Sequence, residues 1–130
     1  MNSSLFADAV VIHAYTRAQA LRDGGLIDVT ETAREAGCRV PVALTAAVWG
    51  DCVAWDARHE KAPQDDSGRL WDVLLMAGHA ACQVRGDRAG FTVLRIPRGG
   101  LQPEPVRLVI HIGPGDQAEP VITIMQPGEN

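Results

Sequence analysis

The sequence of 130 residues contains no apolar run long enough to cross a membrane. A transmembrane helix needs about 20 consecutive apolar residues, and every apolar run in this chain is much shorter. The segment from Met1 to Asp8 also lacks the basic residues and the cleavage site of a secretory signal peptide. We therefore expect a cytoplasmic protein that does not bind membranes.

Cysteine is scarce, and the three thiols follow no known ligand or disulfide pattern. Cys38, Cys52 and Cys82 are widely spaced in apolar segments, as is typical of free thiols in a reducing compartment. A zinc site needs three or four converging Cys or His ligands, and the one local pair is His79 with Cys82. No GxSxG motif occurs either. We expect no disulfide framework, no metal site and no nucleophilic serine or cysteine.

Aromatic residues make up only 5% of the chain, and the formal net charge is -4. A negative chain is a poor general ligand for nucleic acids. The stretch from Arg85 to Ile112 is locally basic, with five arginines against one aspartate and one glutamate: Arg85, Arg88, Arg95, Arg98 and Arg107 against Asp87 and Glu104. Phe91 is its one aromatic residue, so it lacks the stacking groups of a single-strand binding platform. We expect a solvated strand face and no direct binding of nucleic acid.

The apolar content and the length of the chain favour one compact domain. Hydrophobic residues make up 46% of the chain, which suffices for one core, and the length is typical of a single domain covering residues 1–130. The first half alternates short apolar runs with helices that begin at threonine. Its expected elements are a buried strand at 9–15, a helix after Thr16 that ends at Gly24, a strand at 26–29, a helix after Thr30 that ends at Gly37, and an edge strand at 40–44 with Pro41 near its start.

Two further helices and three strands follow. Thr45 is expected to cap a helix at 46–55, and Asp66 or Ser67 to cap the longest helix, whose apolar stripe is Leu70, Val73, Leu74, Ala77 and Ala81. After Gly86, β-branched residues predict strands at 91–96, 106–112 and 121–125. The expected fold is therefore α+β, with a helical N-terminal half packed on a mostly antiparallel C-terminal sheet that the strand at 9–15 can join.

Two segments in the first fifty residues carry a local resemblance. The segment VIHAYT at 11–16 precedes a helix that ends in two glycines, and VALT at 42–45 precedes another helix. Both segments resemble the opening motifs of ADP-ribosyltransferase-like folds. The resemblance implies catalytic roles for His13, Tyr15 and Glu129, and NAD contacts for Thr16 and Thr45. The same residues also allow a structural interpretation, in which His13 lies in a strand, Tyr15 is in the core and both threonines are helix caps.

A second resemblance covers nearly the whole chain. The blocks at 12–37, 40–49, 69–74 and 111–129 are similar to an uncharacterised family of small proteins from plasmids, integrative elements and phages of proteobacteria. The resemblance implies the genetic context of an accessory or counter-defence factor and implies no residue chemistry.

Two functions from different classes remain open. The first is a non-enzymatic binding protein of a mobile element, of the anti-CRISPR or anti-restriction type. Such a protein binds a host protein or a protein–nucleic-acid complex and needs no cofactor. The alternative is an ADP-ribosyltransferase-like enzyme that binds NAD. The enzyme hypothesis requires His13, Tyr15 and Thr45 to line one open cleft.

Overall fold

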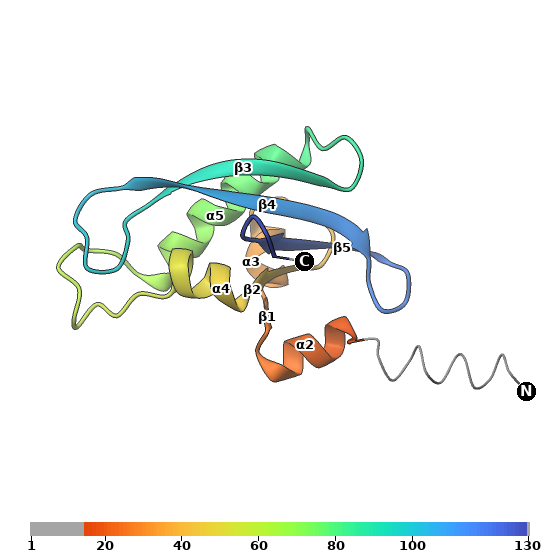
Figure 1. Ribbon diagram of the computed structural model, residues 1–130, viewed down its shortest axis with the longest axis horizontal. Helices are drawn as coiled ribbons and strands as arrows, with labels where there is room; N and C mark the ends of the chain where they lie inside the picture. Colours follow the sequence, from red (N-terminus) through yellow and green to blue (C-terminus); the bar gives the residue numbers. More distant parts are fainter. Residues whose placement is uncertain (1–14, 130) are drawn as a thin grey trace, which may run out of the picture.

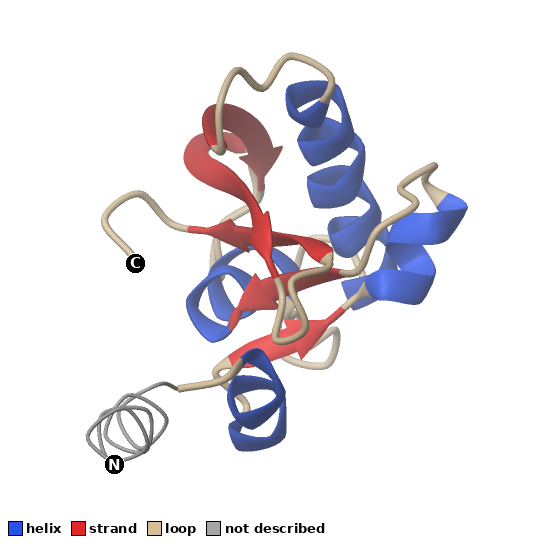
Figure 2. Ribbon diagram, turned by 90° about the vertical axis from the view of Figure 1, so that its right-hand side faces the viewer, coloured by secondary structure: helices blue, strands red, loops and turns tan. Residues whose placement is uncertain are grey.

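All helices but the first cover one face of a five-stranded sheet in the computed structural model, which describes residues 15–129 (Figure 1, Figure 2), and the first lies beside the other face. The elements in chain order are α2 (Arg17–Asp23), β1 (Leu26–Asp28), α3 (Thr30–Glu35), β2 (Val42–Thr45), α4 (Ala46–Val48), the π-helical turn η1 (Trp49–Val53), α5 (Asp66–Ala81), β3 (Arg88–Arg95), β4 (Glu104–Pro114) and β5 (Pro120–Met125). The strand order is β1-β2-β5-β4-β3. The pair β2–β5 is parallel and the other three pairs are antiparallel. The predicted α+β fold with a mostly antiparallel sheet is confirmed.

The prediction of an edge strand around Pro41 is wrong, because β2 lies inside the sheet between β1 and β5. Pro41 stands one residue before the strand, where its missing N–H breaks no ladder bond. Its carbonyl still accepts from the backbone N–H of Ile122 at 2.9 Å. Residues 9–14 of the predicted strand at 9–15 lie outside the described residues, and Tyr15 lies in no strand.

The core lies between the helices and the covered face of the sheet. The alternating residues of the central strands supply its centre, where Leu44, Leu108, Ile110 and Ile124 are almost completely buried. Against them pack four residues of the predicted α5 stripe, Leu70, Val73, Leu74 and Ala77, while Ala81 is partly buried. Each buried aliphatic side chain contributes about 1.5–3 kcal/mol, so this contact fixes α5 on the sheet. No helix within residues 15–129 is long and apolar enough to span a membrane.

Two of the predicted threonine caps are confirmed. The Thr16 hydroxyl accepts from the Gln19 N–H, and the Gln19 side chain accepts from the Thr16 N–H, which forms a capping box. The Thr45 hydroxyl accepts from the Val48 N–H at 3.2 Å. The helix after Thr45 differs from the prediction, however, because its second part winds as the π-helical turn η1.

Two other caps were assigned to the wrong residues, and in each case a neighbouring aspartate accepts from an N–H of the first turn. Thr30 is the first residue of α3, and its N–H donates to the Asp28 carboxylate at 3.0 Å. At α5 the cap is Asp65, which accepts from the Gly68 N–H at 2.7 Å. Asp66 instead accepts from the Trp55 N–H and ties the preceding loop to the helix start.

Candidate binding site

An apolar groove lies between α3, α5 and the middle of the sheet. Its volume is 460 Å³. The sheet supplies aliphatic side chains from β2, β4 and β5, and the helices supply small or aliphatic ones; the lining includes Ala33, Ala36, Val42, Leu74, Ala77, Gly78, Ile110, Ile122 and Ile124. A volume of this size and an apolar lining are typical of binding sites. We refer to it as the α3–α5 groove.

Four residues of α5 lie at the open side of the groove, three of them in its lining and one beside it. Leu75, His79 and Cys82 line the groove and are spaced four and three residues apart, so they share one side of the helix. Met76 lies beside them, three residues before His79. Leu75 and Met76 are each 40% exposed, so the surface of α5 beside the groove is partly apolar. We call these four residues the α5 ridge.

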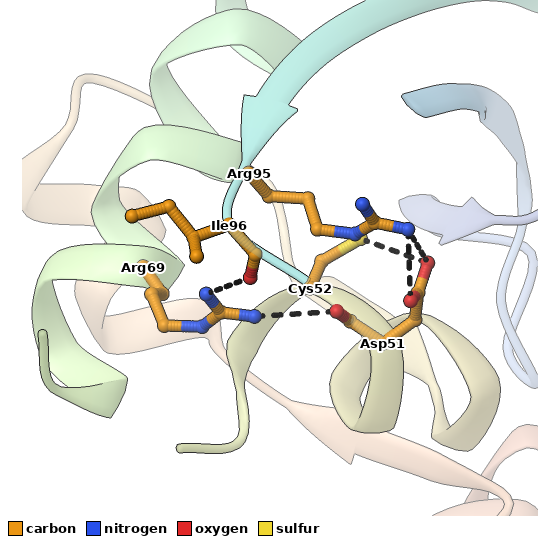
Figure 3. A network of polar contacts seen from close by, with 5 residues as sticks. All are labelled: Asp51, Cys52, Arg69, Arg95 and Ile96. Atoms are coloured by element: carbon orange, nitrogen blue, oxygen red, sulfur yellow. Dashed lines mark hydrogen bonds and ion pairs between the residues drawn. The ribbon is translucent and has the colours of Figure 1, made fainter. Parts of the chain in front are cut away.

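A second feature is a polar network where η1, α5 and the end of β3 meet (Figure 3). Its centre is Arg69, whose residue exposure is only 3%. Three of its donors bind backbone carbonyls, those of Val53 at 3.1 Å, Ile96 at 2.8 Å and Asp51 at 3.2 Å. Further contacts are a hydrogen bond to the Gln64 side chain and a cation–π contact with the Trp55 ring, whose centroid is 4.5 Å away. Burial lowers the pKa of Arg69, yet a guanidinium remains charged at neutral pH.

Arg95 and Asp51 form the ion pair of this network. The Arg95 Nη2 donates to both Asp51 carboxylate oxygens, at 3.1 and 3.2 Å, as Figure 3 shows. Cys52 lies beside the pair, and burial, followed by the Asp51 charge, raises the pKa of its thiol to about 11. The thiol is therefore protonated at neutral pH and is a poor nucleophile.

The structure separates the basic stretch at 85–112 into two sides of the sheet. Arg95 faces the helices and binds Asp51. Arg88 and Arg107 alternate with the buried residues Phe91 and Leu108, so both lie on the other face and are exposed. The basic stretch at 85–112 thus supplies one arginine to an interior ion pair and others to a solvated face of the sheet.

Two of the residues singled out by the ADP-ribosyltransferase resemblance lie at the start of α2. Tyr15 is 63% exposed, so the interpretation that places it in the core is wrong. Its hydroxyl donates to the Asp23 carboxylate at 2.5 Å, which raises the pKa of Tyr15. Thr16 uses its hydroxyl as the cap of α2. His13 lies outside the described residues.

The other two, Thr45 and Glu129, are brought together by the fold. The Thr45 hydroxyl donates to a Glu129 carboxylate oxygen at 2.8 Å, and the same oxygen accepts from the Gln126 N–H at 2.7 Å. Thr45 also caps α4, so its hydroxyl both donates and accepts. This contact connects the end of β2 to the segment after β5.

The sequence interpretation missed Arg69, although a signal for it was present. Arg69 precedes Val73 by four residues, so it lies on the buried side of the predicted stripe. An arginine at such a position must find partners inside the protein. The π-helical turn that supplies two of those partners had no sequence signal. Among residues 15–129, no group of three or more Cys, His, Asp or Glu side chains is placed to hold a metal ion.

Comparison with known proteins gives one match. The family model described as "Family of unknown function (DUF6573)" matches residues 1–130. No curated protein and no solved structure matches the chain.

Proposed function

The chain belongs to the DUF6573 family, and from that premise we propose that it is a binding protein whose interface is the α3–α5 groove with the α5 ridge. The observation that supports this function is the continuity of the two surfaces. The groove has an apolar lining, and Leu75 and Met76 continue it onto the exposed side of α5. An exposed apolar surface next to a cavity is characteristic of a protein interface.

The occupant that fits this surface best is a protein segment that presents apolar side chains. A small ligand inside the groove would leave Met76 in water, whereas a protein surface would cover both the groove and the ridge. NAD fits less well, because its pyrophosphate needs backbone N–H groups or basic side chains. In this lining the ionisable side chains are His79 and the thiols of Cys38 and Cys82.

We further propose that the partner belongs to a host defence system, of the CRISPR or restriction type. This part rests on the similarity of the chain to small proteins of mobile elements. Steric occupation of a host surface needs no catalytic group, so an apolar interface is sufficient for such an action.

A phage-challenge assay with matched variants tests this function. Cells that carry a restriction or CRISPR system and express the wild-type chain should show more plaques than cells without it. Leu75→Glu places a charge in the interface and should abolish the effect. Leu101→Glu alters a leucine that is 58% exposed in the β3–β4 loop and should leave the effect unchanged.

A photocrosslinking amino acid at position 75 then tests the two parts of the proposal separately, the groove as the interface and the defence system as the source of the partner. A crosslinked component of the defence system would support both parts of the proposal. A crosslinked protein unrelated to defence would support the groove as the interface and contradict the proposed class of partner. If Leu75→Glu behaves like Leu101→Glu, the groove is not the interface.

An ADP-ribosyltransferase-like enzyme is the second candidate, and the contact between Thr45 and Glu129 is the observation in its favour. It places a predicted NAD-contacting residue beside the predicted acidic residue. NAD at one hundred times its dissociation constant would stabilise such an enzyme by about 2.7 kcal/mol. A thermal-shift titration without any NAD-dependent change would therefore eliminate this candidate.

A further inference from the structure

A second pocket lies on the opposite part of α5 and shares no lining residue with the α3–α5 groove. Its volume is 240 Å³. The walls are mainly aliphatic, and the lining comprises Cys52, Gln64, Arg69, Asp72, Val73, Val93, Leu94, Arg95, Ile96 and Pro103. Two of these residues are the arginines of the network in Figure 3.

The donors of this pocket are not all used within the described chain. Arg95 binds Asp51 through Nη2 alone, and its buried Nε has no hydrogen-bond partner among residues 15–129. Arg69 uses four of its five N–H groups on neutral oxygens. A buried donor without a partner costs about 1–3 kcal/mol, so a site that retains one is suited to an acceptor from outside the chain.

Unused guanidinium donors favour an anion as that acceptor, because a charged acceptor forms the stronger hydrogen bond. Arg69 and Arg95 are cationic, and the Asp51 charge is already paired with Arg95. Among the described residues of the lining, Asp72 is the one acidic side chain, and it is exposed. Cys52 contributes a neutral thiol at physiological pH, since burial raises its pKa.

We propose that this pocket binds a small carboxylate with a short hydrocarbon chain. The carboxylate accepts from the free donors of Arg95 in the field of Arg69, and the hydrocarbon part contacts Val73, Val93 and neighbouring aliphatic residues. A guanidinium and a carboxylate form strong charge-assisted hydrogen bonds. The aliphatic walls favour such a ligand over phosphate, which has no apolar part.

Titration of the wild-type protein tests the proposal directly. Acetate, propionate, butyrate and inorganic phosphate are added at constant pH and ionic strength while the Arg Nε–H resonances are followed by NMR. The Arg95 resonance should shift saturably, and each added methylene should tighten binding about fourfold. The absence of a saturable shift overturns the site, and phosphate binding as tightly as butyrate overturns the ligand class.

Three variants show whether the pocket is the place of binding. Arg95→Gln should weaken butyrate binding at least about tenfold, because a charge-assisted hydrogen bond is lost. Asp72→Asn should tighten it about two- to fivefold, because a like charge is removed from the lining. Arg88→Gln, on the exposed face of the same strand, should change nothing. The site is overturned if Arg95→Gln and Arg88→Gln have equal effects on butyrate binding. It is also overturned if Asp72→Asn leaves the Kd for butyrate unchanged. The Asp72→Asn result decides the case if Arg95→Gln does not fold.

Discussion

Arg69 carries its charge into the interior, where no carboxylate of residues 15–129 binds its guanidinium directly. Its guanidinium connects three segments that are distant in the sequence: the carbonyls of Asp51 and Val53 in η1, the side chain of Gln64 before α5, and the carbonyl of Ile96 after β3. These backbone carbonyls, in η1 and after β3, accept hydrogen bonds from the Arg69 guanidinium in place of the backbone donors of a regular helix or strand. Arg69 therefore has a structural role at the junction of these elements.

Removal of this side chain should destabilise the protein strongly. Arg69→Met keeps much of the hydrocarbon part but leaves several buried carbonyls without a donor, each at a cost of about 1–3 kcal/mol. We expect the free energy of unfolding to fall by about 3 kcal/mol in urea denaturation. Arg88→Met alters an exposed arginine and should change it by less than about 0.5 kcal/mol. Equal losses in both variants would contradict the role of Arg69.

The thiols should differ widely in reactivity. Cys82 is exposed and should react rapidly with a thiol reagent in the native protein at pH 8. Cys52 is buried and its pKa is about 11, so it should react only after denaturation. Cys82→Ser should remove the rapid phase. Rapid modification of Cys52 in the folded Cys82→Ser variant would show that η1 is more open than the structure indicates.

At the scale of elements, α2 is attached to the rest of the fold by polar contacts of the Arg17 backbone and of the Arg17 side chain. The Asp116 carboxylate accepts from the backbone N–H groups of Arg17 at 2.8 Å and Ala18 at 2.9 Å. The Arg17 guanidinium donates to the Thr123 hydroxyl and to the Ile122 carbonyl of β5. Ala20 is the one buried residue of this helix. The attachment of α2 therefore depends on Asp116 and Arg17 more than on apolar packing.

This attachment should depend on pH. The N–H groups of Ala18 and Arg17 lower the pKa of Asp116. A carboxyl group with a lowered pKa stabilises the folded state above its unfolded pKa and loses this effect as pH falls through the folded value. Amide exchange of Arg17 and Ala18 should therefore accelerate as pH falls below about 4, relative to the amides of β4.

The matched variants are Asp116→Asn and Glu35→Gln. Asp116→Asn should accelerate exchange of the α2 amides at neutral pH and leave the exchange of β4 nearly unchanged. Glu35→Gln, at an exposed position of α3, should have no effect on α2. If α2 exchange is the same in the wild type and in Asp116→Asn, another contact holds the helix.

Most elements could be predicted from the sequence because their signals are local. The α5 stripe follows the helical period, and the caps Thr16 and Thr45 precede their helices directly. The position of β2 inside the sheet could not be predicted, because the pairing of Val42 with Ile122 joins segments 80 residues apart. The turn η1 was missed because the sequence at 49–53 has the apolar spacing of an ordinary α-helix.

At the scale of the whole molecule, the parallel pair β2–β5 joins the two halves of the chain. β1 and β2 come from the first half, and β3, β4 and β5 from the second, yet all five share one sheet. The core likewise combines residues of both halves, such as Val48 and Ile124. Neither half can therefore expose its part of the core without disrupting the other.

Unfolding should for this reason be a single transition. All three tryptophans, at 49, 55 and 71, lie before β3, whereas the longest strands are β3 and β4. Tryptophan fluorescence and far-UV circular dichroism should give the same urea midpoint. Two separate midpoints would show that the halves unfold independently.

The candidate sites could be predicted only in part. Thr45 and Glu129 were singled out separately, and the fold places them in contact. The α3–α5 groove was not predicted, because its lining combines α3 and α5 with strands from both halves, and each of these residues alone has the pattern of an ordinary core residue. A surface that arises from packing has no local signal in the sequence.

Gly78 allows the most direct test of the groove as an interface. It lies on α5 in the groove lining, and a Cβ at this position would meet no atom within 4 Å. Gly78→Leu should fill the groove while it stabilises the free protein by about 0.5–1 kcal/mol, since glycine is a poor helix former. The measurement is the Kd of this variant for the partner crosslinked through position 75. We expect binding at least about tenfold weaker than wild type despite the more stable fold, and binding at the wild-type affinity would contradict the groove as the interface.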